Sequence, residues 1–143
     1  MSKQINFQFL ISYLGLIPYV LTFLDKYYFL IVEEEDLLNF ITYYTLIIIV
    51  FIGSINWNLK NNPPTHIVIY GFLPSLFAVI IIILSLLNIN VLIIFILIIL
   101  LLLTQLFFDY IILFANETNK KVFYFLRLPL TALITIFLLL ISL

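Results

Sequence analysis

Long apolar stretches, separated by short groups of charged and turn-forming residues, make up almost the whole chain. They predict five helices, over residues of about 5–24, 37–57, 66–87, 91–115 and 123–142. Each has the roughly 20 residues that a membrane-spanning helix needs, and none shows the period-2 alternation of a membrane β-barrel strand. The pattern therefore predicts an all-α, polytopic membrane protein. We expect a compact bundle of five transmembrane helices that forms a single domain over residues 1–143.

The longest apolar stretch contains two of these helices. No charged residue occurs from Ile67 to Phe108, which is about twice the length of one span. Asn88-Ile89-Asn90 is the only break within it. We therefore expect a tight turn at this point, between the third and the fourth helix.

Composition excludes most other classes of protein. Of the 143 residues, 66% are hydrophobic and 9% are charged, whereas a soluble domain has about a quarter charged residues. This excludes a soluble globular enzyme and a disordered protein. The net charge of −1 and the scattered basic residues exclude a nucleic-acid binder. The lack of cysteine excludes disulfide scaffolds, thiolate metal sites and thiol catalysis.

The basic residues predict how the five helices are oriented. With five spans, all but one of them fall on or near one side of the membrane, and only Lys26 falls on the other. The residues on the first side are Lys3, Lys60, Lys120, Lys121 and Arg127. The positive-inside rule then places the N-terminus inside and the C-terminus outside.

An acidic run, Glu33-Glu34-Glu35-Asp36, precedes the second helix on the predicted outer side. Negative charge at a helix N-terminus complements the helix dipole, so a solvated helix start explains the run. The alternative is a patch that collects cations. No other residue on that side points to such a patch.

Small and weakly polar residues recur at helical spacing in four of the helices. Such stripes are typical of faces that pack against other helices in lipid. Their members are Gln8, Ser12, Gly15, Tyr19 and Thr22; Thr42, Thr45, Gly53 and Asn56; Gly71, Ser75, Ala78 and Ser85; and Arg127, Thr131 and Thr135. The alternative is a scatter of small residues that face lipid. Pro18 and Pro74 lie well inside their predicted helices, where each is expected to kink the axis.

Asp109 is the most informative polar residue. It lies about six positions, or roughly 9 Å, before the inner end of the fourth helix. A charged group at such depth costs about 2.5–3.5 kcal/mol on insertion scales, so it is expected to face protein or water. Arg127 enters from the same side at similar depth and can reach the carboxylate. These depths predict a buried polar cluster on the inner side, made of Asn56, His66, Gln105, Asp109 and Arg127.

Simpler interpretations of some of these residues stay open. Arg127 can snorkel to the interface, His66 can be an interfacial histidine, and Trp57 suits an aromatic belt. One histidine and scattered carboxylates do not have the spacing of a metal site. No serine is placed for a Ser-His-Asp set, so we expect no catalytic residues, no metal and no cofactor.

Four short motifs resemble those of the transmembrane protein 69 family, and they occur in the family's order. They are Leu14-Gly15-Leu16-Ile17-Pro18-Tyr19, Gly53-Ser54-Ile55-Asn56-Trp57-Asn58, Leu73-Pro74-Ser75-Leu76 and Leu126-Arg127-Leu128-Pro129-Leu130-Thr131. The family's histidine and last glycine are replaced here by Asn56 and Asn58. The resemblance implies a five-helix protein of inner or plasma membranes, catalogued as a domain of unknown function. The family-motif positions it identifies are Gly15, Pro18, Gly53, Trp57, Pro74, Ser75, Arg127 and Pro129.

We expect a non-enzymatic accessory or assembly partner of a membrane complex. The alternative is a small carrier for protons or a polar solute, which acts as an oligomer; an embedded enzyme is a third hypothesis. The expected partners are the lipid bilayer and other membrane subunits or further copies of the chain, with no nucleic acid. No cleavage-site pattern follows the first apolar run, so the first helix is expected to remain as an anchor. The expected location is a bacterial plasma membrane, or the mitochondrial inner membrane in a eukaryote.

Overall fold

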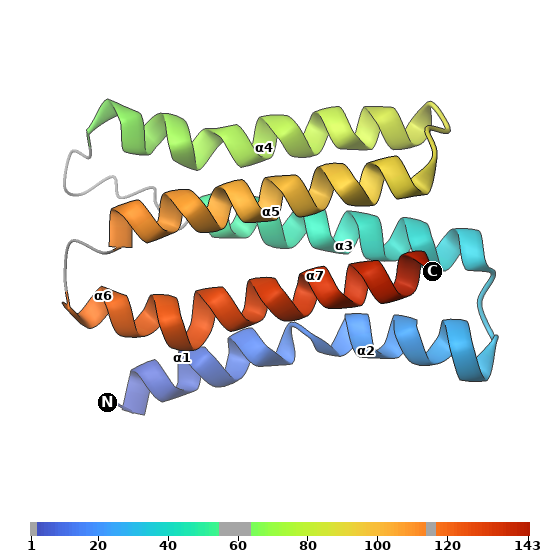
Figure 1. Ribbon diagram of the computed structural model, residues 1–143, viewed down its shortest axis with the longest axis horizontal. Helices are drawn as coiled ribbons and strands as arrows, with labels where there is room; N and C mark the ends of the chain where they lie inside the picture. The colour runs from blue at the N-terminus through green and yellow to red at the C-terminus, as the bar shows by residue number, and fades with distance from the viewer. Residues whose placement is uncertain (1–2, 55–63, 114–116) are drawn as a thin grey trace. The chain divides into compact units, whose positions relative to one another are not determined.

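Helices make up nearly all of the described chain (Figure 1). The computed structural model describes residues 3–54, 64–113 and 117–143, and no strand occurs in these ranges. Five helical segments are long and apolar enough to cross a membrane, which confirms the predicted number. They are Phe9–Phe29, Glu34–Ser54, Thr65–Leu86, Val91–Ile111 and Lys120–Ser142.

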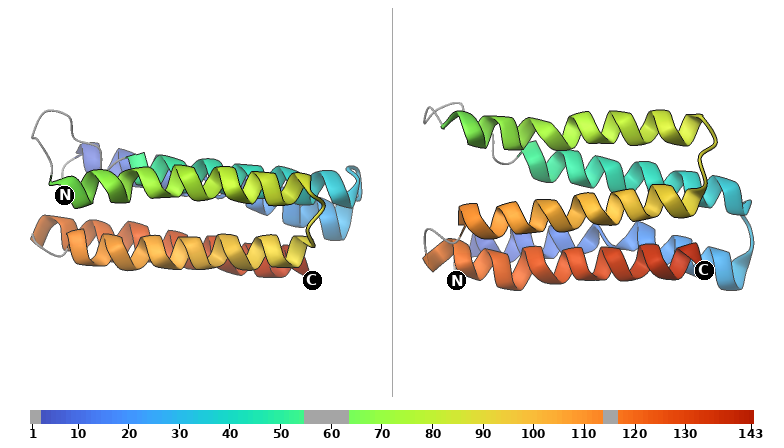
Figure 2. Two further views of the ribbon diagram at one scale, coloured as in Figure 1. Left: turned by 90° about the horizontal axis from the view of Figure 1, so that it is seen from above. Right: turned by 45° about the horizontal axis from the view of Figure 1, so that its top comes forward.

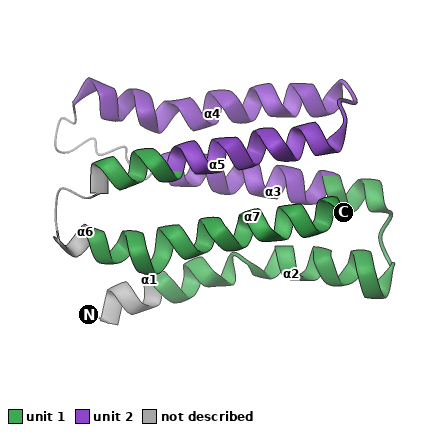
Figure 3. Cartoon of the chain, viewed as in Figure 1, with its two compact units in different colours: residues 1–38, 106–143 green, residues 39–105 purple. Residues whose placement is uncertain are grey.

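Contacts between residues divide the chain into two compact units (Figure 3). Unit 1 contains residues 1–38 and 106–143, and unit 2 contains residues 39–105. The single domain expected from the sequence stays a prediction.

Unit 1 contains both ends of the chain. Its elements are α1 (Lys3–Leu14), α2 (Ile17–Leu24), the π-helical turn η1 (Asp25–Phe29), the first residues of α3 (Glu34–Ser54), the last residues of α5 (Val91–Leu113), α6 (Glu117–Val122), the π-helical turn η2 (Phe123–Arg127) and α7 (Leu128–Ser142).

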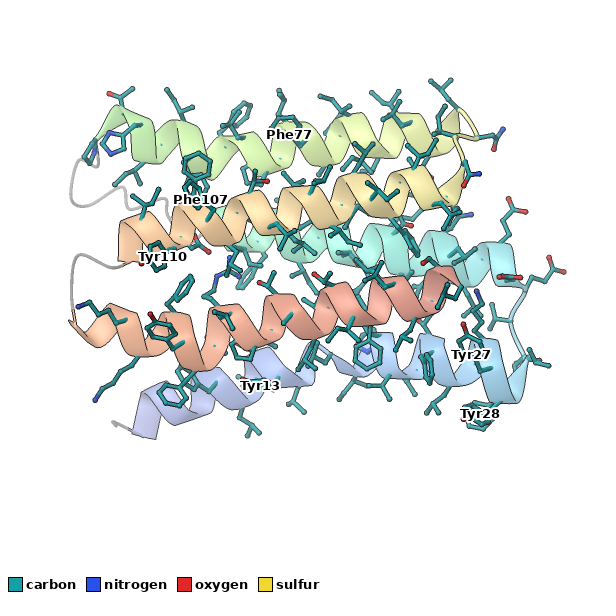
Figure 4. All side chains as sticks on the ribbon, in the orientation of Figure 1. Tyr13, Tyr27, Tyr28, Phe77, Phe107 and Tyr110 are labelled. Atoms are coloured by element: carbon teal, nitrogen blue, oxygen red, sulfur yellow. The ribbon has the colours of Figure 1, made fainter. Side chains whose placement is uncertain are left out.

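The first and last spans of unit 1 run in the same direction. The Tyr13 hydroxyl donates to the carbonyl of Phe125 (2.8 Å), and the Tyr27 hydroxyl donates to the carbonyl of Leu140 (2.7 Å). Because the residue numbers rise together along both segments, α1 and α2 are parallel to α7 (Figure 1). Figure 4 shows Tyr13 and Tyr27 near the two ends of this contact, whereas the exposed Tyr28 points away from α7.

The polar stripes predicted for the first and fifth helices contribute to the core of unit 1. Tyr19, Thr22 and Thr131 are buried, and the Tyr19 ring lies 6.2 Å from the ring of Phe137. Ser12, Gly15, Arg127 and Thr135 are half-buried. Close helix packing through these small and polar residues is therefore confirmed for much of the stripe.

The first span is interrupted, and Pro18 lies at the start of a helix instead of within one. α1 ends at Leu14 and α2 begins at Ile17, with Gly15 between them. Pro18 is thus in the first turn of α2, where the missing N–H breaks no helical hydrogen bond. The expected proline kink within one long helix is replaced here by a break between two helices.

Three helix ends also differ from the prediction. The first span continues past residue 24 through η1, because the Asp25 carboxylate accepts the backbone N–H of Val32 (3.0 Å) at the turn that follows. α3 begins at Glu34 instead of residue 37, so most of the acidic run is in its first turn, where it complements the dipole. The last helical segment begins at Glu117 in α6 instead of residue 123.

The predicted tight turn between the third and fourth spans is confirmed (Figure 2). α4 (Thr65–Leu86) is followed by Asn88 in the left-handed region at φ 55°, and the N–H of Ile89 donates to the carbonyl of Leu84 (3.2 Å). This is the Schellman ending of a helix. The Asn90 side chain accepts the N–H of Leu92 (2.8 Å) and caps α5. The turn and the cap make α4 and the unit 2 part of α5 antiparallel.

In unit 2, α3 and α4 approach closely at a glycine. A Cβ atom added to Gly53 would lie 2.8 Å from Cγ of Pro74 and 3.0 Å from the carbonyl oxygen of Gly71. These three residues and Ala78 are buried, whereas Ser75 and Ser85 are half-buried. On α3 the predicted stripe residues Thr42 and Thr45 are buried as well. The small-residue stripes of α3 and α4 thus include the residues at the helix contact.

Large apolar side chains also cover the outside of the helices. Ile47, Phe51 and Phe107 are each more than 60% exposed, and many others resemble them. A soluble monomer rarely exposes apolar surface of this extent. Together with the five apolar segments, this surface indicates a membrane protein.

Candidate functional site

An ion pair within the spans joins α5 to η2 in unit 1. The Arg127 Nε donates to Oδ2 of Asp109 (2.6 Å), and a second guanidinium nitrogen contacts the same oxygen. The side chains of Arg127 and Asp109 are 13% and 5% exposed. The pair anticipated from their matched depth is therefore present, with both donors on one carboxylate oxygen. Each charge has its counter-charge where water is scarce.

A proline and a tyrosine shape the backbone that carries Arg127. Pro129 has no N–H and cannot donate to the carbonyl of Phe125, four residues earlier. The Tyr13 hydroxyl donates to that carbonyl instead. The chain widens here into η2, which ends at Arg127. The residues Arg127 and Pro129 of the fourth motif thus lie together at a π-helical turn, and Tyr13 is a contact that the sequence analysis missed.

Gln105 connects three helices of unit 2. Its Nε2 donates to the carbonyl of Ile49 on α3 (2.9 Å), and its own backbone carbonyl accepts the hydroxyl of Tyr70 on α4 (3.0 Å). The Gln105 residue is 2% exposed. Its predicted burial is confirmed, and its bonded partners belong to unit 2.

The remaining candidate residues lie elsewhere. The predicted burial of His66 is wrong: its side chain is exposed, because it is the second residue of α4 and lies in the first turn of that helix. Asn56 and Trp57 lie outside the described residues. A buried cluster that includes His66 is therefore wrong, whereas Asp109 and Arg127 form the predicted pair. The convergence of Asn56 and Gln105 on that pair stays a prediction.

Lys26 has a structural role that the sequence analysis missed. Its Nζ donates to the carbonyl of Ile141 (2.6 Å) and lies 3.0 Å from Oε1 of Glu34. Its side chain is 13% exposed, whereas that of Glu34 is 65% exposed. The ammonium group thus lies at the C-terminal end of α7, where a cation complements the helix dipole. The sequence pattern predicts only that Lys26 is the single basic residue of the outer side.

Neighbouring side chains complete this helix ending. The Tyr27 hydroxyl donates to the carbonyl of Leu140, and the Ser142 hydroxyl donates to that of Leu139 (2.7 Å each). The last four carbonyls of a helix have no N–H partner within it. Three consecutive carbonyls near the end of α7 therefore receive side-chain donors, and two of these donors come from η1.

Replacing Lys26 with Met keeps the aliphatic stem and removes these polar contacts. We expect Lys26→Met to lower the free energy of unfolding by about 1–2 kcal/mol, because the charge-assisted hydrogen bond that caps α7 is lost. Glu34→Gln is the matched control and is expected to cost less than about 1 kcal/mol, since it removes an exposed ion pair and one of three acidic charges in the first turn of α3. Unfolding by SDS titration in mixed micelles measures both. Equal losses in the two variants would contradict a capping role for Lys26.

No group of three or more His, Cys, Asp or Glu side chains that could hold a metal ion occurs in the described ranges. Comparison with known proteins finds no matching family model, curated protein or solved structure. The local geometry is therefore the basis for any statement on function.

Proposed function

We propose that the chain is an integral membrane protein that acts as a non-catalytic accessory or assembly partner of a larger membrane complex. The observation that carries this proposal is how the polar side chains of its helices are used. Asp109 pairs with Arg127, Lys26 and Tyr27 bond to α7, and Gln105 bonds to α3 and α4. These groups connect helix to helix within a unit. Polar side chains that stabilise the fold in this way suit a protein that offers a stable apolar surface to other subunits.

The orientation belongs to the same proposal: the N-terminus lies inside and the C-terminus outside a plasma or mitochondrial inner membrane. The parallel course of the first and last spans in unit 1 supports it, because the first and fifth of five spans cross in the same direction. The positive-inside distribution of the lysines determines which end of the chain lies inside. Membership of the transmembrane protein 69 family remains a proposal, based on the four ordered motifs.

Labelling of single cysteines tests this orientation against a clean background, since the natural chain has no cysteine. Glu35 and Lys121 are exposed and belong to opposite ends of unit 1. We expect Glu35→Cys to react with a membrane-impermeant maleimide in intact cells. Lys121→Cys is expected to react only after the membrane is opened. Labelling of both from the same side would contradict five spans with the proposed orientation.

A proton or solute carrier is the second candidate, because Asp109 is a buried carboxylate within a span and such groups often line transport paths. The two candidates differ in what they require of Asp109. A structural pair tolerates neutral, hydrogen-bonding substitutes at both positions, whereas a proton carrier needs a group that titrates.

Cells that lack the chain provide the decisive experiment. We expect them to lose a membrane complex that co-purifies stoichiometrically with the tagged chain in mild detergent. The wild type and the neutral pair Asp109→Asn/Arg127→Gln are both expected to restore the complex. The proposal fails if the purified chain is only a homo-oligomer that carries out pH-dependent flux in liposomes. It also fails if the neutral pair, present at normal levels, restores no complex.

A further inference from the structure

The side-chain oxygen of Gln105 is the most unusual polar atom in unit 2. The residue is 2% exposed, and no described protein group donates a hydrogen bond to its Oε1. It lies six residues before the end of the span Val91–Ile111, or about 9 Å inside it. Most buried side-chain amide oxygens in folded proteins have a donor, from protein or from ordered water.

The hydrogen bond made by Nε2 of Gln105 determines the orientation of its side-chain amide. The carbonyl of Ile49 can only accept, so the group that faces it at 2.9 Å must be the Nε2 donor. A flipped amide would set two oxygens against each other. Oε1 is therefore the atom that needs a separate donor.

Two buried hydroxyl groups of α3 and α4 donate their hydrogens elsewhere. Tyr70 donates its single hydroxyl hydrogen to the backbone carbonyl of Gln105, and Thr45 donates its own to the carbonyl of Ile41 (2.7 Å). The backbone N–H groups within α3, α4 and α5 donate along their helices. Among the described residues of unit 2, no donor to Oε1 is found, which favours a small molecule that fits a buried position.

We propose that Oε1 of Gln105 binds a buried water molecule inside unit 2, where Gln105 joins α5 to α3 and α4. Water is the one donor small enough for a residue buried to this degree, and it occupies sites lined by several polar atoms. The Ile49 carbonyl and the Tyr70 hydroxyl oxygen, both bonded to Gln105, supply lone pairs at the same junction. In a membrane-embedded segment such a water replaces hydrogen bonds that lipid cannot offer. The site is a structural water position that also hydrates the interior of an otherwise apolar span.

A high-resolution structure of the wild-type protein in lipid tests this directly. We expect a water peak at about 2.7–3.2 Å from Oε1 of Gln105. The peak is expected to be absent in Gln105→Met, which keeps the side-chain length and removes the acceptor. A dry Oε1 in wild type overturns the proposal, as does a protein, lipid or detergent group that donates to it.

A second measurement does not depend on the variant folding well. The chain has three glutamines, Gln4, Gln8 and Gln105, so ¹⁵N-Gln labelling gives three side-chain amide nitrogen signals, each with its pair of protons. Gln8→Met and Gln4→Met assign two of these signals, which leaves that of Gln105. In the deuterated protein we expect its amide protons to show dipolar cross-relaxation with a long-lived water, with the sign that excludes proton exchange. Complete absence of that cross-peak would contradict the bound water.

Discussion

Arg127→Met is expected to lower the free energy of unfolding by about 3–5 kcal/mol, among the largest losses for any single substitution in this chain. The variant leaves the Asp109 carboxylate, 5% exposed, without the guanidinium that contacts it. Asp109 is a short side chain on α5 and cannot extend far toward water. Reversible unfolding in SDS–detergent mixtures, or steric trapping in bicelles, measures the loss.

Substitution of the other member of the pair, Asp109→Leu, is expected to lower the free energy of unfolding by less. Arg127 has a long side chain that is already 13% exposed, and it can extend toward the interface when its partner is gone. Replacing both residues removes both charges together, so the double variant is expected to be more stable than Arg127→Met. The cycle then gives a coupling of about 1–3 kcal/mol.

Lys121→Met serves as the matched control for loss of a basic residue, because Lys121 is exposed. Its expected effect is within about 0.5 kcal/mol. Single losses at Asp109 and Arg127 that simply add in the double variant would show that the two side chains do not stabilise each other.

The number and kind of helices could be predicted from the sequence because lipid imposes a length on every apolar run. The hairpin at Asn88 and Asn90 was predictable for the same reason, since a run of twice that length must turn once. The ends were harder. The charged residues Asp25 and Lys26 look like a helix end, yet the helix continues through both because their side chains find backbone partners.

In the candidate site, only the contact between charged residues at equal depth in the membrane could be predicted from the sequence. Asp109 and Arg127 lie at matched depths in consecutive spans, and a buried charge needs a partner, so the sequence predicts their contact, with snorkelling of Arg127 to the interface as the alternative. The contacts of Tyr13 with Phe125 and of Lys26 with Ile141 could not be predicted. Both contacts join segments more than 100 residues apart, and in both the acceptor is a backbone carbonyl. Because every residue has such a carbonyl, the amino-acid sequence does not indicate which one is the acceptor.

Gly53→Val is the second substitution with a large expected effect, about 1–3 kcal/mol or more in unfolding free energy. The first added carbon already falls 2.8 Å from Cγ of Pro74 and 3.0 Å from the carbonyl oxygen of Gly71. Backbone and a proline ring cannot move aside as a flexible side chain does. α3 and α4 must then separate within unit 2, and the contacts around Gly53 are lost. The same SDS titration measures this loss.

Two matched variants separate crowding from an effect on the helix itself. Ser54→Val puts the same side chain on the next residue of α3, where Ser54 is exposed, and is expected to cost little. Gly53→Ala improves helix propensity by about 1 kcal/mol, which opposes the crowding. In a Pro74→Ala background, Cγ of Pro74, the atom nearest to a Cβ at residue 53, is absent. Gly53→Ala is therefore expected to lower the free energy of unfolding by less there than in the wild type. An unchanged cost in that background would mean that the contact with Pro74 is not what requires a glycine at this position.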